Sequence, residues 1–387
     1  MKKKILWITG TCFFDVDENV VPKVSKLYDL YWVVLRQSVS FYSLEYIRNF
    51  MRQNEVKGYV SNLGKMSSFR AFKNYLSIIH LIKSEKYDLI YVNFMGLPYL
   101  FPLLLWLGID PNRIVYPCHD FLDHVDIKNR RAISIYKKYI FHNFKHFQFF
   151  SKSQQKLFLE KYKKKNTFYA PLALKGFGVA KESEIARDKV VFLFFGSIRE
   201  NKGLEYLIEA ANKLYEKYGN KFVVKIYGGC SNWEHYSKII RYNECFDLQI
   251  RRIENDEVAN LFSASDYLIL PYKDVTQSGP LLISYYYGIP VIASDHDGFR
   301  EYIQDKENGF LFNNRDSNDL YCVMSRILDG NYNDKKIKEN LLKFVSDNIE
   351  IEKIITLYDK AFGEIIKEKR KAEDRNRNRT DTGGKGM

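Results

Sequence analysis

Residues 190–204 read VVFLFFGSIRENKGL and join an unbroken apolar run to a polar loop that begins and ends with glycine. Six consecutive apolar residues are typical of a parallel strand that is buried on both faces. Apolar residues then recur at helical spacing beyond the loop, at Leu204, Leu207, Ile208, Ala211 and Leu214. This strand, loop and helix predict a parallel sheet covered by helices.

The same alternation of strand-like and helical segments continues on both sides of this stretch. In the first half of the chain we expect strands at residues 4–9, 30–35, 57–61, 89–94, 114–117, 147–151 and 167–171. In the second half we expect further strands at residues 222–227, 267–270 and 291–293. The fold class is therefore α/β, with two doubly wound parallel-sheet domains. Two such domains in tandem place a cleft between them, and ligands bind at the carboxyl ends of the strands.

The domain boundaries follow from changes in composition along the chain. We expect an N-terminal domain over residues 1–172, a linker over 173–189 and a C-terminal domain over 190–346. Residues 347–366 are expected to form a final helix. Residues 367–387 are charged and rich in glycine near the end, so we expect a disordered tail.

Composition excludes several classes of protein. Hydrophobic residues make up 46% of the chain and charged residues 28%, which argues against a long disordered chain and a polytopic membrane protein. The five cysteines form no CxxC pair, which fits a reducing cytosol better than a disulfide scaffold or a zinc site. The first residues are expected to form a strand rather than a signal peptide. The apolar run at 94–109 is short for a membrane-spanning helix.

Positive charge is concentrated in the first half of the chain. Residues 1–175 hold 28 Lys and Arg against 13 Asp and Glu, whereas residues 176–387 hold 32 against 34. The segment 128–165 combines 12 basic residues and one acidic residue with several phenylalanines, which suits an anionic membrane surface. A solvated basic helix is the alternative, and no nucleic-acid-binding motif is present. The expected membrane or acceptor surface comprises Lys128, Arg130, Arg131, Lys137, Lys138 and Lys145.

Two loops of the second half carry residues suited to a nucleotide. In the loop 196–203, Gly196 and Ser197 start a turn in which Arg199 and Lys202, with backbone N–H groups, suit a diphosphate. The alternative is an ordinary turn with two solvated cations. The loop 271–280 offers polar groups at the positive end of a helix, and a capped turn without ligand is its alternative. Its candidate residues are Thr276, Gln277, Ser278, Gly279 and Pro280.

His119 follows the expected strand at 114–117 and would face the same cleft, although a lone histidine is more often structural than catalytic. Two acidic triplets, at 15–17 and 295–297, imitate metal-binding sequences. Neither has a supporting cluster of His or Glu ligands, so no metal site is expected.

Residues 195–210 resemble the first donor motif of the family 4 retaining glycosyltransferases, also called glycosyl transferases group 1. The segments 266–271, 277–281 and 287–294, with Gly298, Glu301 and 308–311, resemble the second block of that family. The first half is similar only through Gly10 and the His119-Asp120 pair. The resemblance implies a GT-B fold, which consists of two Rossmann-like domains. It also implies an enzyme of the bacterial surface-polysaccharide type. In such enzymes the final helix often returns to the first domain.

The resemblance also implies roles for individual residues. Arg199 and Lys202 match basic positions that neutralise the leaving nucleoside diphosphate, and no metal or other cofactor is expected. His119 matches a histidine on the acceptor side, and Gly10 matches a glycine loop that lets donor and acceptor approach. The second block departs from the family pattern, because Thr276 and Ser284 occupy the positions of its two usual glutamates. Ser284 would make only a weaker hydrogen bond to the ribose.

These implications predict a cytoplasmic enzyme at the inner face of the plasma membrane. It would move a sugar from a nucleoside-diphosphate donor to a lipid-linked saccharide during capsule or lipopolysaccharide synthesis. Two alternatives stay open: a GT-B nucleotide-sugar 2-epimerase, and a non-catalytic partner in a glycan-assembly complex.

Overall fold

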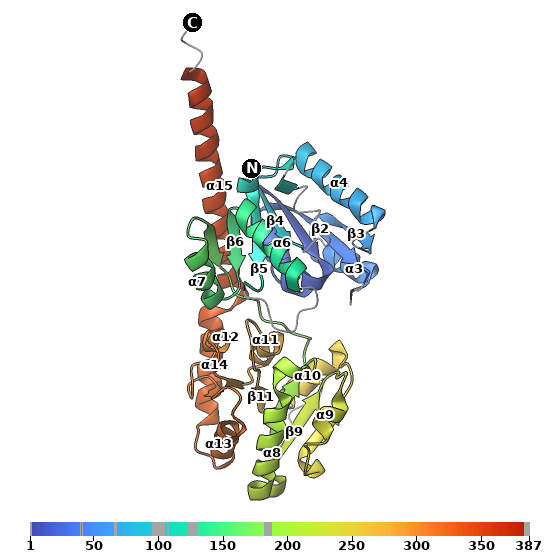
Figure 1. The fold of residues 1–387 in the computed structure, drawn as a ribbon, viewed down its shortest axis with the longest axis vertical. Helices are drawn as coiled ribbons and strands as arrows, with labels where there is room; N and C mark the ends of the chain where they lie inside the picture. The colour runs from blue at the N-terminus through green and yellow to red at the C-terminus, as the bar shows by residue number, and fades with distance from the viewer. Residues whose placement is uncertain are drawn as a thin grey trace. The chain divides into compact units, whose positions relative to one another are not determined.

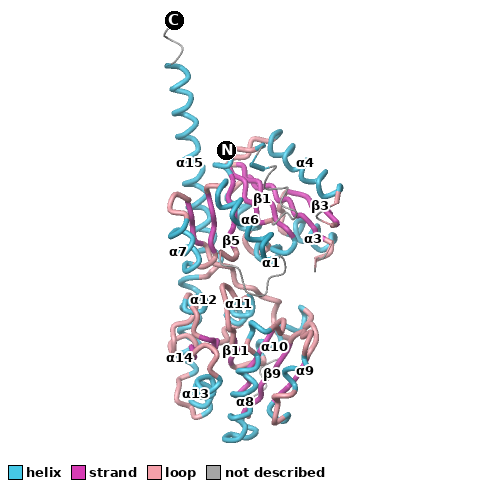
Figure 2. The backbone as a smooth tube through the Cα atoms, in the orientation of Figure 1, coloured by secondary structure: helices cyan, strands magenta, loops and turns pink. Residues whose placement is uncertain are grey.

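A computed structural model describes residues 2–38, 40, 42–65, 68–94, 105–106, 108–121, 130–181 and 188–382, without the side chains of residues 130, 132 and 372–382. The chain divides into two compact units, Met1–Ala173 with Ile351–Met387, and Leu174–Glu350. Each unit contains its own parallel sheet flanked by helices (Figures 1 and 2). The predicted fold class is therefore confirmed in both units.

The first unit is built on a sheet whose described strands follow the order β3-β2-β1-β4-β5-β6-β7. Chain order reverses between β1 and β4, and such a reversal opens a crevice at the carboxyl ends of the strands. The strands are β1 (Lys4–Gly10), β2 (Asp29–Gln37), β3 (Gly58–Gly64), β4 (Leu89–Asn93), β5 (Ile114–Cys118), β6 (His146–Phe149) and β7 (Asn166–Tyr169).

Both faces of this sheet are covered, as the alternation along β1 shows. Leu6 and Ile8 join one apolar cluster with helices α4 and α6, whereas Ile5 and Trp7 join another with α2, α3 and α15. The helices are α1 (Phe14–Asp17), α2 (Val21–Leu27), α3 (Leu44–Gln53), α4 (Phe69–Ser84), α6 (Arg130–Asn143), α7 (Lys152–Lys161) and α15 (Ile351–Thr382), with short 3-10 turns η1 (Thr11–Phe13) and η2 (Pro111–Arg113).

Helix α15 packs within the first unit and is longer than the expected final helix (Figure 1, red). The Tyr358 ring lies 5.7 Å from the Trp7 ring, and the Tyr358 hydroxyl accepts a hydrogen bond of 2.7 Å from Gln148. Residues 367–382, which the sequence analysis placed in a tail, continue this helix. That segment contains neither glycine nor proline and is rich in Glu, Lys and Arg, which favour helix. Residues 383–387 lie outside the described residues.

The second unit contains a sheet in the order β10-β9-β8-β11-β12-β13, and chain order reverses between β8 and β11. The buried run 190–195 forms β8, as predicted. The strands are β8 (Val190–Phe195), β9 (Phe222–Tyr227), β10 (Phe246–Gln249), β11 (Tyr267–Leu270), β12 (Val291–Ser294) and β13 (Phe310–Phe312). The helices are η3 (Glu200–Lys202), α8 (Leu204–Tyr218), η4 (Gly219–Lys221), α9 (Trp233–Ser237), η5 (Asn243–Cys245), α10 (Asn255–Ser263), α11 (Gly279–Tyr286), α12 (Asp297–Arg300), α13 (Ser317–Leu328) and α14 (Asp334–Asn348).

Within the described part of the chain, no helix has the length and apolarity needed to cross a membrane.

Candidate functional site

The two loops singled out in the second unit follow β8 and β11, the strands on either side of the order reversal. Gly203 has φ of +61°, and a Cβ atom built on it would lie 2.0 Å from the carbonyl oxygen of Pro271. The Lys273 N–H donates a 2.9 Å hydrogen bond to the carbonyl of Asn201. The loops 196–203 and 271–280 are therefore interlocked through their backbones, and only glycine fits at position 203.

Lys202 is the half-buried cation of this pair of loops. Its Nζ lies 3.6 Å from the centre of the buried Tyr272 ring, a cation–π contact. Burial and the neighbouring Arg199 lower the pKa of Lys202 to about 8. Arg199 is exposed, and no ion pair involves Arg199 or Lys202 within the described ranges. Two adjacent cations that lack a carboxylate partner form a site suited to an anion.

A second charged pair lies beside these cations and was missed by the sequence analysis. Lys273 Nζ and Glu205 Oε1 are 2.5 Å apart in a half-buried ion pair. The Oε2 atom of Glu205 and the Oδ1 atom of Asn201 are buried without a hydrogen-bond partner. A hollow of about 440 Å³ lies here, and its lining includes Arg199, Glu205, Asn232 and Lys273. The unsatisfied acceptors suit a ligand that brings hydroxyl or N–H donors.

Helix α11 begins at the second loop, as predicted. The Ser278 side chain caps the helix by accepting from the Leu281 N–H at 3.4 Å, and Pro280 occupies its first turn. Gly279 is exposed, with nothing within 4 Å of a Cβ atom built on it. Thr276 and Gln277 are half-buried in the loop that leads to this end. A ligand therefore has room at the positive end of α11.

The environment of Ser284 differs from that expected of a residue that contacts the ribose. Its side chain is fully buried, and its hydroxyl donates a 2.8 Å hydrogen bond to the carbonyl of Ile289. The hydroxyl holds the end of α11 to the turn before β12. The sequence position matched the family glutamate, but the helix turns this side chain into the core.

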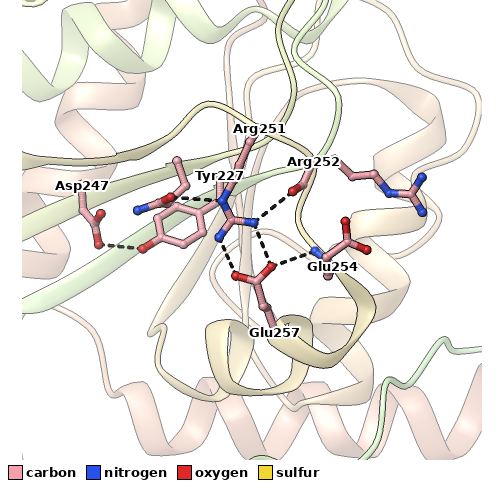
Figure 3. A network of polar contacts seen from close by, with 7 residues as sticks. Tyr227, Asp247, Arg251, Arg252, Glu254 and Glu257 are labelled. Carbon is pink, nitrogen blue, oxygen red and sulfur yellow. Dashed lines mark hydrogen bonds and ion pairs between the residues drawn. The ribbon is translucent and has the colours of Figure 1, made fainter.

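A polar network lies at the carboxyl ends of the neighbouring strands β9 and β10 (Figure 3). Arg251 donates to Glu257 from two nitrogens, at 2.9 and 2.6 Å, and the Glu254 N–H donates to Glu257 at 2.9 Å. The Arg251 guanidinium lowers the pKa of Glu257 to about 2. Glu254 and Glu257 form a capping box at α10, in which Glu254 is the cap. The network fixes the loop after β10 to the start of α10.

In the first unit, His119 follows β5 and is held tightly. Its ring stacks between Phe13, at 4.1 Å, and Phe150, at 4.6 Å. The Nε2 atom lies 2.8 Å from Oδ1 of Asn93, the last residue of β4. Burial lowers the pKa of His119 to about 4, although Asp120 opposes the shift. The imidazole is therefore neutral at physiological pH.

Asn93 connects His119 to a fully buried carboxylate that the sequence analysis treated only as part of an acidic triplet. Asp17 accepts hydrogen bonds from Asn93 Nδ2 at 3.0 Å, from Trp7 Nε1 at 2.9 Å and from Thr9 Oγ1 at 2.5 Å. Burial raises the pKa of Asp17 to about 7 despite these three donors. No motif signals this network, because its members are scattered over four elements.

A mainly apolar cavity of about 260 Å³ extends from His119 under helix α6. Its lining includes Asn93, His119 and Lys137 together with Ile140, Phe141 and Phe147. Gly10, at the end of β1, lies outside that lining. A Cβ atom on Gly10 would come within 2.8 Å of the Phe94 ring, so the close approach that it permits here is to Phe94.

The structure places the residues expected on the membrane surface in different environments. Arg131 and Lys138 are exposed on α6, near the exposed Ile135. Lys137 is half-buried and lines the cavity. Lys145 pairs with Glu368 of α15 at 3.3 Å, so it does not contribute to an open basic face. Lys128 lies outside the described residues, and only the backbone of Arg130 is described.

The acidic triplets at 15–17 and 295–297 do not belong to a set of metal ligands among the described residues. In the described part of the chain, no three His, Cys, Asp or Glu residues are placed to hold a metal ion. Asp295 instead pairs with Arg300 at 2.5 Å.

Residues 189–330 match the model of the glycosyl transferases group 1 family. The second unit carries a glycosyl transferases group 1 domain. This match covers β8 to α13, and thus both interlocked loops, the Lys202 cation and the start of α11. The predicted group 1 domain is confirmed.

Two relatives among curated proteins are similar at low identity. A 41.2 kDa protein in the cps region of Klebsiella pneumoniae is 26% identical over 177 residues, or 46% of this chain and 47% of that protein. A glycosyltransferase of Methanocaldococcus jannaschii is 23% identical over 207 residues, or 51% of this chain and 53% of the relative. The chain therefore spans about half the length of the curated relatives it matches.

Solved structures are similar over nearly the whole chain. The Rickettsia africae glycosyltransferase has a TM-score of 0.72 at 16% identity, covering 95% of this chain and 99% of that one. The Anabaena protein HepE, solved with UDP and glucose, has a TM-score of 0.69 at 14% identity, covering 94% of this chain and 100% of that one. These likenesses show the GT-B fold.

Proposed function

We propose that the chain is a glycosyltransferase of family 4 that transfers a sugar, with retention of configuration, from a nucleoside-diphosphate sugar to a saccharide acceptor. The observation that carries the proposal is the pair Arg199 and Lys202, which lies at the order reversal of a glycosyl transferases group 1 domain. The match to the domain gives the class of reaction, and the two cations give the chemistry of the donor.

The donor diphosphate would bind between the two interlocked loops. Lys202 and Arg199 supply positive charge that grows in value as the leaving diphosphate gains negative charge. The exposed start of α11 at Gly279 adds backbone N–H groups and the positive end of the helix. The unsatisfied oxygens of Asn201 and Glu205 accept from donor hydroxyls or base N–H groups. The proposed donor site gives no role to a metal ion.

The first unit would bind the acceptor. His119 supplies a neutral imidazole to the lining of a mainly apolar cavity. Such a cavity suits an acceptor that joins a saccharide to an apolar group, as a lipid-linked saccharide does. The Klebsiella relative in a cps region supports a role in bacterial surface-polysaccharide or lipopolysaccharide synthesis.

A peripheral position on the cytoplasmic face of the membrane belongs to the same proposal. Helices α4 and α6 cover the same face of the first sheet, and neither contains an acidic residue. Their outward sides expose Phe69, at 70% of its surface, and Ile135, at 66%, beside basic residues that include Lys73 and Lys138. Apolar and basic groups together favour binding to anionic lipid. Vesicle flotation with and without anionic lipid tests this part of the proposal.

The test of transfer is release of nucleoside diphosphate from UDP-, GDP-, CDP-, ADP- and dTDP-sugars, with and without membrane lipid extract from bacteria that make surface polysaccharide. We expect one donor to release its diphosphate only when the acceptor extract is present, with an NMR-detected product of unchanged anomeric configuration. Epimerised donor without acceptor would instead indicate the 2-epimerase. Donor binding without any turnover would indicate the non-catalytic partner, and neither alternative is favoured by the comparisons.

A further inference from the structure

Lys273 holds the chain on both sides of Lys202. Its N–H donates to the carbonyl of Asn201 at 2.9 Å, and its Nζ atom lies 2.5 Å from Oε1 of Glu205. Asn201 directly precedes Lys202, and Glu205 follows it in the first turn of α8. One residue of the second loop therefore fixes both ends of the short segment 201–205, which contains Lys202.

The residue before Lys273 supplies the surface on which Lys202 lies. Nζ of Lys202 is 3.6 Å from the centre of the Tyr272 ring, and Tyr272 is buried. The Tyr272 carbonyl accepts a hydrogen bond of 2.5 Å from Ser294, the last residue of β12, so the ring is carried on a fixed backbone. Two adjacent residues of one loop thus contact the side chain of Lys202 and hold the backbone beside it.

Lys273 is a third cation at these loops, but its charge already has a partner. The side chains of Lys273 and Glu205 are only 19% and 20% exposed, so water screens this ion pair less than it screens a surface pair. Asn314 Nδ2 also donates to the Lys273 carbonyl, at 3.4 Å, from the segment after β13. These contacts suit Lys273 to holding the loops together and not to binding an anion.

We propose that Lys273 and Glu205 are positioning residues, which hold the Lys202 ammonium over the Tyr272 ring in the place where it contacts the donor diphosphate. The inference rests on the proposed function, in which Lys202 binds that diphosphate. It extends that function, because Lys273 and Glu205 act through Lys202 and are not themselves ligands. A charged group that is fixed before its ligand arrives loses less conformational freedom when the ligand binds.

The state of Lys202 depends on its burial more than on any charged neighbour. Burial is the larger of the two causes that lower its pKa to about 8, and Arg199 is the smaller. If the ammonium left the Tyr272 ring for water, its pKa would return toward the ordinary lysine value of 10.5. The pKa of Lys202 therefore reports whether the ammonium is in place. The other charged or titratable residues of the adjoining segments are Glu200 in the first loop, Glu205 on α8, Lys273 and Asp274 in the second loop, and His296 after β12.

The variant Glu205→Gln separates positioning from a direct effect of charge, because the two effects have opposite signs. The substitution keeps the size of the side chain and removes its negative charge. Acting directly through space, that loss would lower the pKa of Lys202 and strengthen the binding of an anion nearby. Loss of the anchor for Lys273 would instead let Lys202 move into water, which raises its pKa and weakens the binding of the diphosphate.

The first measurement is a carbon-13 NMR titration of the lysine Cε signals in the full chain without nucleotide, with Lys202→Arg identifying the signal. We expect Lys202 to titrate near pH 8 in the wild type, and about one pH unit or more higher in Glu205→Gln. Glu216→Gln is the matched control and should leave the titration unchanged. Glu216 lies near the other end of α8, in an exposed ion pair with Arg241.

Titration calorimetry at pH 7 with UDP, GDP, CDP, ADP and dTDP gives a second readout. Glu205→Gln is expected to weaken binding of the diphosphate that the wild type binds by about tenfold, and Glu216→Gln to leave it unchanged. A pKa of Lys202 that falls or stays the same in folded Glu205→Gln, or equal or tighter binding there, would overturn the inference.

The two readouts keep this inference apart from the proposed function. If the wild type binds none of the five diphosphates, the proposed function fails, while the NMR titration still decides whether Glu205 holds Lys202 in place. If Glu205→Gln does not fold, Glu205→Asp decides the point, because it keeps the charge and shortens the side chain. The same upward shift is expected in Glu205→Asp, and its absence would contradict the inference.

Discussion

The carboxyl ends of the two sheets are built in different ways. In the second unit the loops after β8 and β11 are interlocked through backbone atoms at Gly203, and their cations, Lys202 and Arg199, have no carboxylate partner in the described residues. In the first unit a fully buried carboxylate, Asp17, organises side chains around a neutral imidazole. The carboxyl ends of the second sheet present positive charge on a rigid backbone. The carboxyl ends of the first sheet present fixed hydrogen-bonding groups.

The difference indicates which kind of ligand each unit binds. A cation pair without a carboxylate partner in the described residues gains most from an anion, because the charge of Lys202 is already partly removed from water. A neutral, oriented imidazole gains most from a hydroxyl group whose position matches it. The comparison therefore supports the proposed function, in which the second unit binds the diphosphate and the first unit binds the saccharide.

The largest effect is expected for Lys202→Ala. Loss of one group that stabilises charge in a transition state costs about 100- to 1,000-fold in turnover, so kcat should fall by that factor. Lys221→Ala is the matched control, because Lys221 is exposed just before β9, at the amino end of that strand and not at the carboxyl ends that carry the two loops. Equal kcat in the two variants would contradict the role of Lys202.

Next in size is the effect of Gly203→Ala on stability. A methyl group would lie 2.0 Å from the carbonyl oxygen of Pro271, in a backbone conformation with φ of +61°. We expect a loss of about 3 kcal/mol in the free energy of unfolding, measured with denaturant. Gly219→Ala is the control, because Gly219 has φ of +55° but open space around it, and about 1 kcal/mol is expected. Similar losses would mean that the loops are not interlocked.

The affinity of the donor site for the nucleoside diphosphate should also decrease as the pH rises. The pKa of Lys202 is lowered to about 8, so the side chain is charged below that pH and loses its charge above it. Affinity for the nucleoside diphosphate should fall by up to about tenfold per pH unit above 8. Titration calorimetry from pH 7 to 9.5 measures this. In Lys202→Arg the slope should disappear, and a slope that persists there would assign the proton to another group.

The smallest effect is expected for Arg251→Ala in the exposed network of Figure 3. Exposed ion pairs contribute little because water screens them, so the melting temperature should change by less than about 2 °C. Thermal unfolding monitored by circular dichroism is the measurement. A shift of many degrees would show that this network, rather than the interlocked loops, holds the site together.

The sequence predicted the parts of this comparison that depend on local order. The apolar run of β8, the helical spacing of α8 and the cap at Ser278 each follow from residues close together in the chain. Strands β10 and β13 were missed because one is only partly buried and the other has three residues.

The features that sequence could not predict depend on contacts between distant segments. Asp17 meets Asn93 across 76 positions, and Asn93 meets His119 across 26. Residue type alone gave Asp17 no role, because an acidic triplet in a loop is common. Ser284 matched a family position, yet the direction of its side chain is set by the packing of α11 and could not be read from the alignment of residues.

The most direct test of the central claim is titration calorimetry of the purified chain with UDP, GDP, CDP, ADP and dTDP at pH 7. The account predicts that one diphosphate binds, that Lys202→Ala weakens its binding at least about tenfold, and that Lys221→Ala leaves it unchanged. Failure of all five diphosphates to bind, or equal binding by the wild type and Lys202→Ala, would contradict the account.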